Sequence, residues 1–209
     1  MGSPEKRKKE KENKKNTILR AARKLFFDRG FKSVTVDSIA AKAGVSKGSI
    51  YLYFDSKEEI YAQVLITDNI ELNKNIKIFS TREASAAELL LEFSQIYINY
   101  FLDHNELFRI LMTFMLQTEQ MNLTQEQNTE LIRTTNDNIK VISTIIQKGI
   151  DSGEFTPIID IRQAQNAIWG LFNGIISLYL FMGNPAKRAD RIHSMVKDSL
   201  NIFIKGLKK

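Results

Sequence analysis

Apolar residues recur with the period of an α-helix along most of this chain. The first clear stripe is formed by Ile18, Ala22, Leu25 and Phe26, whose spacing places them on one face of a helix. Strand-like alternation is rare, and the three prolines stand between the helical segments rather than inside them. The pattern therefore predicts an all-α protein. The expected helices cover residues 17–28, 36–43, 47–54, 57–79, 84–103, 105–117, 124–151, 159–182 and 186–207.

Two short helices with a tight turn between them follow the first helix. Thr35 and Ser46 stand where N-caps belong, directly before two apolar runs, and Gly44 ends the first run because glycine tolerates a positive φ. Two helices joined in this way are typical of a helix-turn-helix, whose second helix enters the major groove of DNA. Ile50 and Phe54 are expected to face the core, which leaves the rest of the second helix for contacts with a partner.

The outward side of that second helix carries groups suited to DNA. Lys47 can donate to a phosphate or to a guanine edge, Gly48 lets the backbone come close, and Ser49 can pair with many bases. Tyr51 can offer its hydroxyl to a phosphate. These residue types at these positions predict a recognition helix.

From Thr17 to about Tyr61 the sequence resembles the DNA-binding domain of the tetracycline-repressor family of bacterial and archaeal regulators. The resemblance is carried by the run ILRAARKLFFDRGFKSVTVDSIAAKAGVSKGSIYLYFDSKEEI. Helix N-termini favour phosphate, and the resemblance implies that Thr35 and Lys57 contact it there. Without the resemblance, the structural reading of each residue is the commoner one: Thr35 as a cap and Lys57 as a surface charge. The residues predicted to bind DNA are Thr35, Ser46, Lys47, Gly48, Ser49, Tyr51, Tyr53 and Lys57.

The remainder of the chain resembles the sensor bodies of the same family more loosely. The similarity lies in helix order and in the stretches LIRTTNDNIKVISTIIQKGIDSGEF and AIWGLFNGIISLYLF. It implies a two-fold homodimer formed by the last two helices, with a pocket for a small molecule inside each body. The implied arrangement is a three-helix helix-turn-helix domain followed by a larger helical domain for ligand binding and dimerisation.

The helix expected at 159–182 is apolar almost all round, with small residues along one side. Such a helix must be buried on most sides, either against a second copy of the chain or as the central helix of its own domain. The residues predicted to form the dimer interface are Ala167, Gly170, Gly174, Ser177, Val196 and Phe203.

Aromatic and methionine side chains gather on three helices of the body. They indicate either an ordinary core or the wall of a pocket, and the scarcity of charges among them favours an apolar or amphipathic ligand. The residues predicted to line such a pocket are Phe93, Tyr97, Met112, Met115, Trp169, Phe172 and Asn173.

Charge is distributed unevenly along the chain, whose net charge is +6. Residues 1–15 contain seven basic and three acidic side chains and no apolar run. We therefore expect 1–15 to be a disordered basic tail, 16–60 to be the helix-turn-helix domain, and 61–209 to be the effector-binding and dimerisation domain. A basic N-terminal region favours a polyanionic partner, although a tail that only keeps the protein in solution has the same composition.

The inventory of reactive groups indicates a protein without catalytic function. Cysteine is absent, the two histidines lie far apart, and no phosphate-binding loop or nucleophile elbow occurs. No metal or other cofactor is expected. The charged N-terminus predicts no secretory signal, and the most apolar run is shorter than the ~20 residues of a membrane span. The expected location is the cytoplasm.

These observations predict a sequence-specific regulator of transcription that binds double-stranded DNA. Its expected form is a homodimeric repressor, released from a palindromic operator when a small apolar or amphipathic effector binds the C-terminal domain. Two alternatives stay open: a DNA-organising protein of the same fold without an effector, and a small-molecule carrier.

Overall fold

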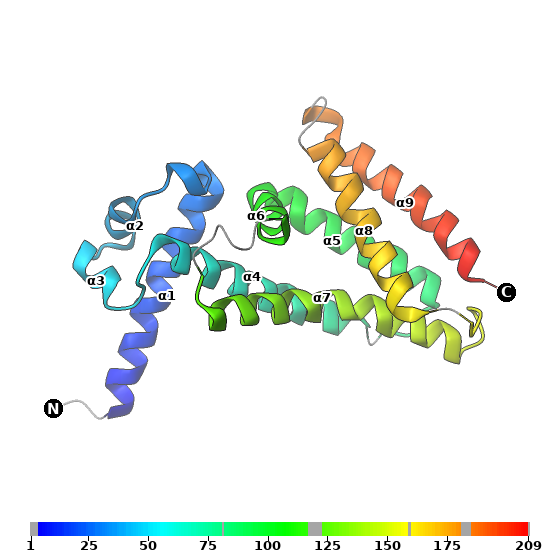
Figure 1. The fold of residues 1–209 in the computed structure, drawn as a ribbon, viewed down its shortest axis with the longest axis horizontal. Helices are drawn as coiled ribbons and strands as arrows, with labels where there is room; N and C mark the ends of the chain where they lie inside the picture. Colours follow the sequence, from blue (N-terminus) through cyan, green and yellow to red (C-terminus); the bar gives the residue numbers. More distant parts are fainter. Residues whose placement is uncertain (1–3, 81, 117–122, 159, 181–184, 209) are drawn as a thin grey trace. The chain divides into compact units, whose positions relative to one another are not determined.

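The computed structural model describes residues 4–80, 82–116, 123–158, 160–180 and 185–208 (Figure 1). Over these residues the elements are helical, apart from one isolated antiparallel bridge between Phe155 and Lys208. The α-helices are α1 (Pro4–Arg29), α2 (Val36–Ala43), α3 (Lys47–Tyr51), α4 (Lys57–Ser80), α5 (Ala86–Asp103), α6 (Asn105–Leu116), α7 (Gln125–Asp151), α8 (Ile161–Leu180) and α9 (Arg188–Leu207). Two 3-10 turns are η1 (Phe31–Ser33) and η3 (Pro185–Lys187). The predicted helix ends at residues 117, 159 and 182 lie outside the described residues.

The chain divides into two compact units. One comprises residues 1–68 and 106–132, and the other comprises residues 69–105 and 133–209. This division follows packing, so the functional boundary expected at residue 60 stays a prediction. Each unit is described by itself below.

The first unit is built around the C-terminal half of α1, which packs on α2. The predicted stripe of Ile18, Ala22, Leu25 and Phe26 is buried. Ile50 and Phe54 are buried as well, as their position in the pattern predicted. The unit also contains an aromatic cluster, in which the centroid of the Tyr61 ring lies 4.8 Å from that of Phe26 and 4.5 Å from that of Phe31.

The N-terminal segment differs from the prediction. Residues 4–15 continue α1 as one uninterrupted helix, whereas the sequence pattern predicted disorder over 1–15. The physical reason lies in the residues themselves, because lysine, glutamate and arginine favour a helix and no glycine interrupts the segment. Glu5 with Lys9 and Glu10 with Lys14 also stand four residues apart, with the acid nearer the N-terminus, which is the favourable order for a helical ion pair.

The second unit packs α5, α8 and α9 together, and α8 and α9 run side by side (Figure 1). α7 ends at Asp151, the residue predicted from the sequence, and Gly153 adopts a positive φ of 76° just after it. The following residue, Glu154, reaches the start of α5, where its carboxylate oxygens accept hydrogen bonds from the backbone N–H groups of Ala86 and Ala87 at 2.7 and 3.0 Å. A carboxylate at a helix N-terminus satisfies free donors and favours the helix dipole. The turn after α7 therefore holds α5 in place.

Candidate DNA-binding surface and ligand-binding body

Hydrogen-bonded caps define the start of both helices of the helix-turn-helix. The Thr35 hydroxyl accepts from the backbone N–H of Ser38 at 3.2 Å, and the Ser38 hydroxyl accepts from the N–H of Thr35 at 3.1 Å. At α3, the Ser46 hydroxyl accepts from the N–H of Ser49 at 3.1 Å. Gly44 lies between the two helices in the left-handed conformation, with φ 68° and ψ 33°. These contacts fix the turn, so the two helix N-termini have a defined direction.

The outward side of α3 is open to solvent. Lys47, Gly48 and Tyr51 are exposed, and Leu52 just beyond the helix keeps 76% of its surface exposed. A Cβ atom on Gly48 would meet only the Ser46 hydroxyl oxygen, at 3.9 Å, which is ordinary contact. The protein's own packing therefore does not require glycine at this position. The predicted close approach of DNA to Gly48 stays a prediction.

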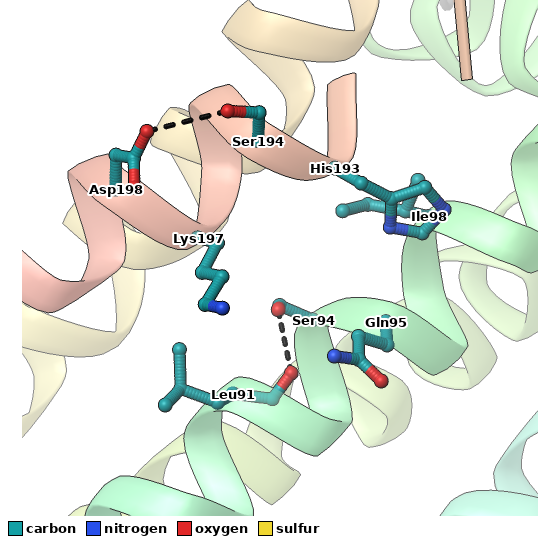
Figure 2. A pocket seen from close by; sticks show the side chains of 8 residues that line it. All are labelled: Leu91, Ser94, Gln95, Ile98, His193, Ser194, Lys197 and Asp198. Carbon is teal, nitrogen blue, oxygen red and sulfur yellow. Dashed lines mark hydrogen bonds between the residues drawn. The ribbon is translucent and has the colours of Figure 1, made fainter. Parts of the chain in front are cut away.

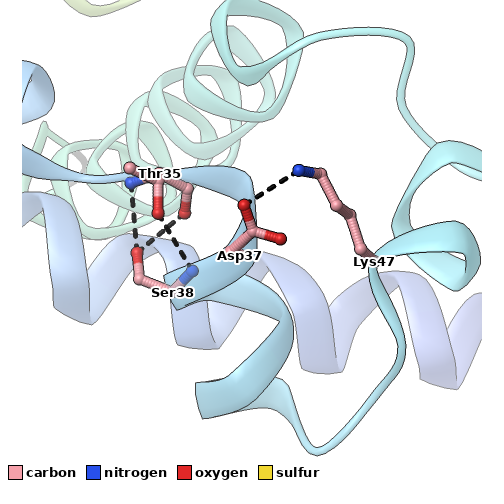
Figure 3. Close-up of polar contacts among 4 residues, drawn as sticks. All are labelled: Thr35, Asp37, Ser38 and Lys47. Atoms are coloured by element: carbon pink, nitrogen blue, oxygen red, sulfur yellow. Dashed lines mark hydrogen bonds and ion pairs between the residues drawn. The ribbon is translucent and has the colours of Figure 1, made fainter.

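Lys47 forms an ion pair that the sequence reading missed. Its Nζ atom lies 2.8 Å from Oδ2 of Asp37, in the first turn of α2 (Figure 3). The hydrogen bond and the negative charge of Asp37 raise the pKa of the Lys47 ammonium above its usual value. Asp37 stands ten residues away in sequence, and only the folded turn brings the two side chains together. Asp37 thus restrains the side chain that was predicted to read bases.

Lys57 has partners inside its own unit. Its Nζ donates to the backbone carbonyls of Phe31 and Val34, at 3.1 and 3.0 Å, and lies 4.1 Å from the centroid of the Phe31 ring. These contacts tie the first turn of α4 to the segment before α2. The predicted phosphate contact of Lys57 stays a prediction, and the structure adds a second role in holding this segment.

A second ion pair joins α1 to α4 within the first unit. Nε of Arg23 donates to Oδ1 of Asp68 at 2.7 Å, and Asp68 is almost fully buried. The Arg23 guanidinium also lies 4.7 Å from the centroid of the Phe27 ring. The charged residues are 45 positions apart, so local pattern gave no signal of this pair. A buried carboxylate paired in this way fixes how α1 lies on α4.

In the second unit, residues predicted to line a pocket form a hydrogen-bonded cluster instead of an open wall. The Tyr97 hydroxyl donates to Oδ1 of Asn173 at 2.9 Å and accepts from Nε1 of Trp169 at 3.2 Å. Burial raises the pKa of the Tyr97 hydroxyl well above its ordinary value, while the bonds to Trp169 and Asn173 lower it. The hydroxyl therefore stays protonated and remains a donor. Phe93 and Phe172 are buried beside it, their ring centroids 6.0 and 5.8 Å from that of Tyr97.

The two methionines of the predicted pocket lie elsewhere in the chain. Met112 and Met115 are on α6, in the first unit, and Met115 is exposed. Five of the seven predicted residues thus share the second unit, and their role in binding a ligand stays a prediction.

A pocket of about 390 Å³ opens between α5 and α9 (Figure 2). Lys197 extends from α9 toward Ser94 and Leu91 of α5, and the Ser94 hydroxyl donates to the Leu91 carbonyl at 2.7 Å. None of the lining residues is among those predicted from the sequence to bind a ligand. They are Leu91, Ser94, Gln95, Ile98, His193, Ser194, Lys197 and Asp198.

Small residues of α8 face outward from the second unit. Ala167, Gly170 and Gly174 are exposed, and a Cβ atom on either glycine would meet nothing within 4 Å. Large apolar side chains are exposed nearby in sequence and on α9, including Leu178 at 53% and Ile202 at 72%. The chain by itself therefore leaves an apolar surface on these two helices uncovered.

The remaining predicted interface residues vary in exposure. Ser177 and Phe203 are partly exposed. Val196 is fully buried within the unit. The prediction that its side chain contacts a partner therefore does not fit the structure. The reason is helical phase, since Val196 falls on the buried stripe with Ile192 and Leu200.

Two family models match the chain in succession. Bacterial regulatory proteins of the tetR family match over residues 18–64, and the Tetracyclin repressor-like C-terminal domain matches over residues 83–204. The second match alone spans more than half of the chain. The chain belongs to the tetracycline-repressor family and is a transcriptional regulator of that family. This confirms the predicted all-α fold with an N-terminal helix-turn-helix and a larger helical domain.

Known relatives agree with this assignment. The chain is 28% identical to the fatty acid metabolism regulator protein of Bacillus subtilis over 174 residues, which is 82% of this chain and 86% of that protein. It is 28% identical to the HTH-type transcriptional repressor KstR2 of Mycolicibacterium smegmatis over 154 residues, 71% of each. The structure of the regulator FadR from Bacillus subtilis in complex with stearoyl-CoA is similar in fold, with a TM-score of 0.72, 22% identity, and coverage of 91% of this chain and 97% of that one.

Two features of the described residues bear on metal binding and membrane association. No group of three or more histidine, aspartate or glutamate side chains placed to hold a metal ion occurs among them. No helix in the described part of the chain has the length and apolar character needed to cross a membrane.

Proposed function

We propose that this protein is a homodimeric repressor that binds a palindromic DNA operator and is released from it by an amphipathic acyl ligand. The DNA-binding part is supported chiefly by the outward side of α3, where Lys47, Gly48 and Tyr51 are exposed while Ile50 is buried. Thr35, Ser46, Ser49 and Tyr53 complete the proposed DNA surface with Lys57. Such a regulator acts where the DNA is, in the cytoplasm, and the proposal includes no catalytic step.

Selection of bound sites from a random DNA pool tests the operator. A near-palindrome is expected, with half-sites about one turn apart, roughly 34–36 Å, because each subunit supplies one short recognition helix. Lys47→Ala should change the selected consensus, since the base it contacts is no longer read. Identical consensus sites from wild type and Lys47→Ala would contradict base reading by this residue.

The proposed dimer places α8 and α9 against the same helices of a second copy. Support comes from the uncovered surface around Gly174, Leu178 and Ile202. Gly174→Leu tests it well, because a Cβ atom at this position meets nothing within 4 Å in its own subunit, so the added bulk is directed at the uncovered surface where a partner would lie. We expect a smaller mass in solution and weaker operator binding. A variant that stays dimeric with wild-type operator affinity would exclude this interface.

The proposed effector class rests on the similarity to the fatty acid metabolism regulator and on the apolar residues around Tyr97 in the second unit. Stearoyl-CoA, the ligand in the FadR complex, is the natural probe. Titrating it into the complex with the selected operator should release DNA, whereas free coenzyme A should not. Stable DNA binding at saturating stearoyl-CoA would favour the effector-independent, DNA-organising alternative.

A further inference from the structure

One face of α1 changes its chemistry along its length. From Ile18 and Ala22 onward it is apolar and buried against the rest of the first unit. Toward the N-terminus, the same stripe continues at spacings of four, three and four residues through Lys14, Lys11 and Arg7. In an α-helix these spacings keep side chains on one side. The side that forms the core in one half of α1 is therefore cationic in the other half.

A second row of basic residues runs beside the first. Lys15 stands four residues before the buried Leu19, and Lys8 stands seven before Lys15, so both fall on the same side. We call the set Arg7, Lys8, Lys11, Lys14 and Lys15 the cationic face. The acidic residues of this segment lie outside it: Glu5, Glu10 and Glu12. The segment's net positive charge is thus gathered on one side of the helix.

The structure indicates where the cationic face points. Nζ of Lys15 lies 5.5 Å from the centroid of the Phe54 ring, just after α3, so this side of α1 is the one that carries the helix-turn-helix. The N-terminal end of α1 extends past α3 (Figure 1). Twelve helical residues, from Pro4 to Lys15, span about 18 Å, which corresponds to about five base pairs of duplex DNA.

We propose that the cationic face of α1 binds backbone phosphates of the DNA that flanks each half-site. This inference rests on the proposed function and adds a contact that the helix-turn-helix does not make. The face has no aromatic or aliphatic side chain to read a base or to enter a lipid layer, which leaves sequence-independent pairing with phosphates. The contact lengthens the footprint and steepens the salt dependence without changing the consensus site.

Two double variants of equal charge test the direction of the face. Lys11→Gln with Lys14→Gln removes two charges from it, and Lys6→Gln with Lys9→Gln removes two from the opposite side of the same helix. Glutamine keeps nearly the helix propensity of lysine, so α1 should persist, which circular dichroism checks. DNA affinity is measured at a series of salt concentrations on two duplexes that contain the selected operator. One duplex is trimmed to the half-sites, and the other carries about ten flanking base pairs, twice the length that residues 4–15 of α1 span.

On the long duplex, Lys11→Gln with Lys14→Gln should flatten the slope of log affinity against log salt by about 1.8, the loss of two phosphate contacts. The trimmed duplex and the Lys6/Lys9 variant should show little change. If the two double variants lose equal amounts of salt slope, only the net charge of the segment matters and the proposal is overturned. Equal losses of slope on both duplexes would overturn it as well. Wild-type protein with no preference for the selected operator over random DNA would instead overturn the proposed function.

Discussion

The helix-turn-helix and the packed helices of the second unit use polar side chains in opposite ways. In the first, Lys47 and Tyr51 lie at the surface, while Ile50 between them is buried in the core. In the second, Tyr97 and Asn173 are buried and satisfy each other by a hydrogen bond. Polar side chains therefore serve different purposes in the two units, and tyrosine occurs in both. A polar group that is exposed on a rigid helix is available to a partner, whereas one that is buried and paired already contributes to the fold.

This comparison is tested most strongly at Phe172, which is fully buried on α8. Phe172→Ala should lower the free energy of unfolding by about 3–5 kcal/mol, because removing a packed ring leaves a cavity. Denaturant unfolding measures this. Ile158→Ala, at a side chain 90% exposed, is the control and should change stability by less than about 0.5 kcal/mol. A loss below about 1 kcal/mol at Phe172 would mean that the ring lines open space, as a pocket wall does.

Lys57 is an exception to this comparison. It lies in the DNA-binding unit, but its ammonium group donates hydrogen bonds to backbone carbonyls of that same unit. Lys57→Ala should lower the free energy of unfolding by about 1.5–3 kcal/mol, since the carbonyls of Phe31 and Val34 lose a charged donor. Lys42→Ala, at an exposed position of α2, serves as the control. If Lys57→Ala weakens DNA binding and leaves unfolding unchanged, the side chain acts only on phosphate.

The order of helices and the direction of the recognition helix could be predicted from the sequence, because both follow from local spacing. Caps such as Thr35 and Ser46 act within three or four residues. The hydrogen bonds of the Lys57 side chain could not be predicted, since the carbonyl groups that accept them lie 23 and 26 residues away in the sequence. The same holds for Tyr97 and Asn173, which are 76 residues apart. Local pattern shows that such side chains are polar or aromatic, and only packing shows what they meet.

The residues before Thr17 show a different limit of predicting structure from the sequence. Their charged composition is typical of disorder, and the apolar stripe that marks the rest of α1 is missing there. The helix persists because its residue types favour it and because acid–base pairs stand four residues apart. A reading based on apolar spacing alone therefore places the start of α1 too late.

The hydroxyl of Tyr97 offers a finer test of the second unit. Tyr97→Phe should lower the free energy of unfolding by about 1–2 kcal/mol, because Oδ1 of Asn173 and Nε1 of Trp169 lose their partner in a buried place. Adding Asn173→Leu should recover part of this loss, since an apolar pair of similar shape leaves fewer unsatisfied groups. A double-mutant cycle measures the coupling. Additive losses would show that the two groups do not depend on each other.

The smallest expected effect concerns Asp37, and it separates two ways in which Lys47 can meet DNA. The Asp37 carboxylate holds the Lys47 ammonium and places a negative charge in the first turn of α2, where a phosphate would otherwise be favoured. We expect Asp37→Asn to raise affinity for random DNA several-fold and to steepen its salt slope by about 0.9, the equivalent of one added phosphate contact. Operator affinity should rise less if Lys47 contacts a base there, as proposed, so the ratio of specific to non-specific binding should fall. Asp28→Asn is the matched control, since it removes the same charge from an exposed pair with Lys24 in the same unit. If both variants raise random and operator binding equally, the effect is one of net charge, and Asp37 has no part in selecting where Lys47 binds.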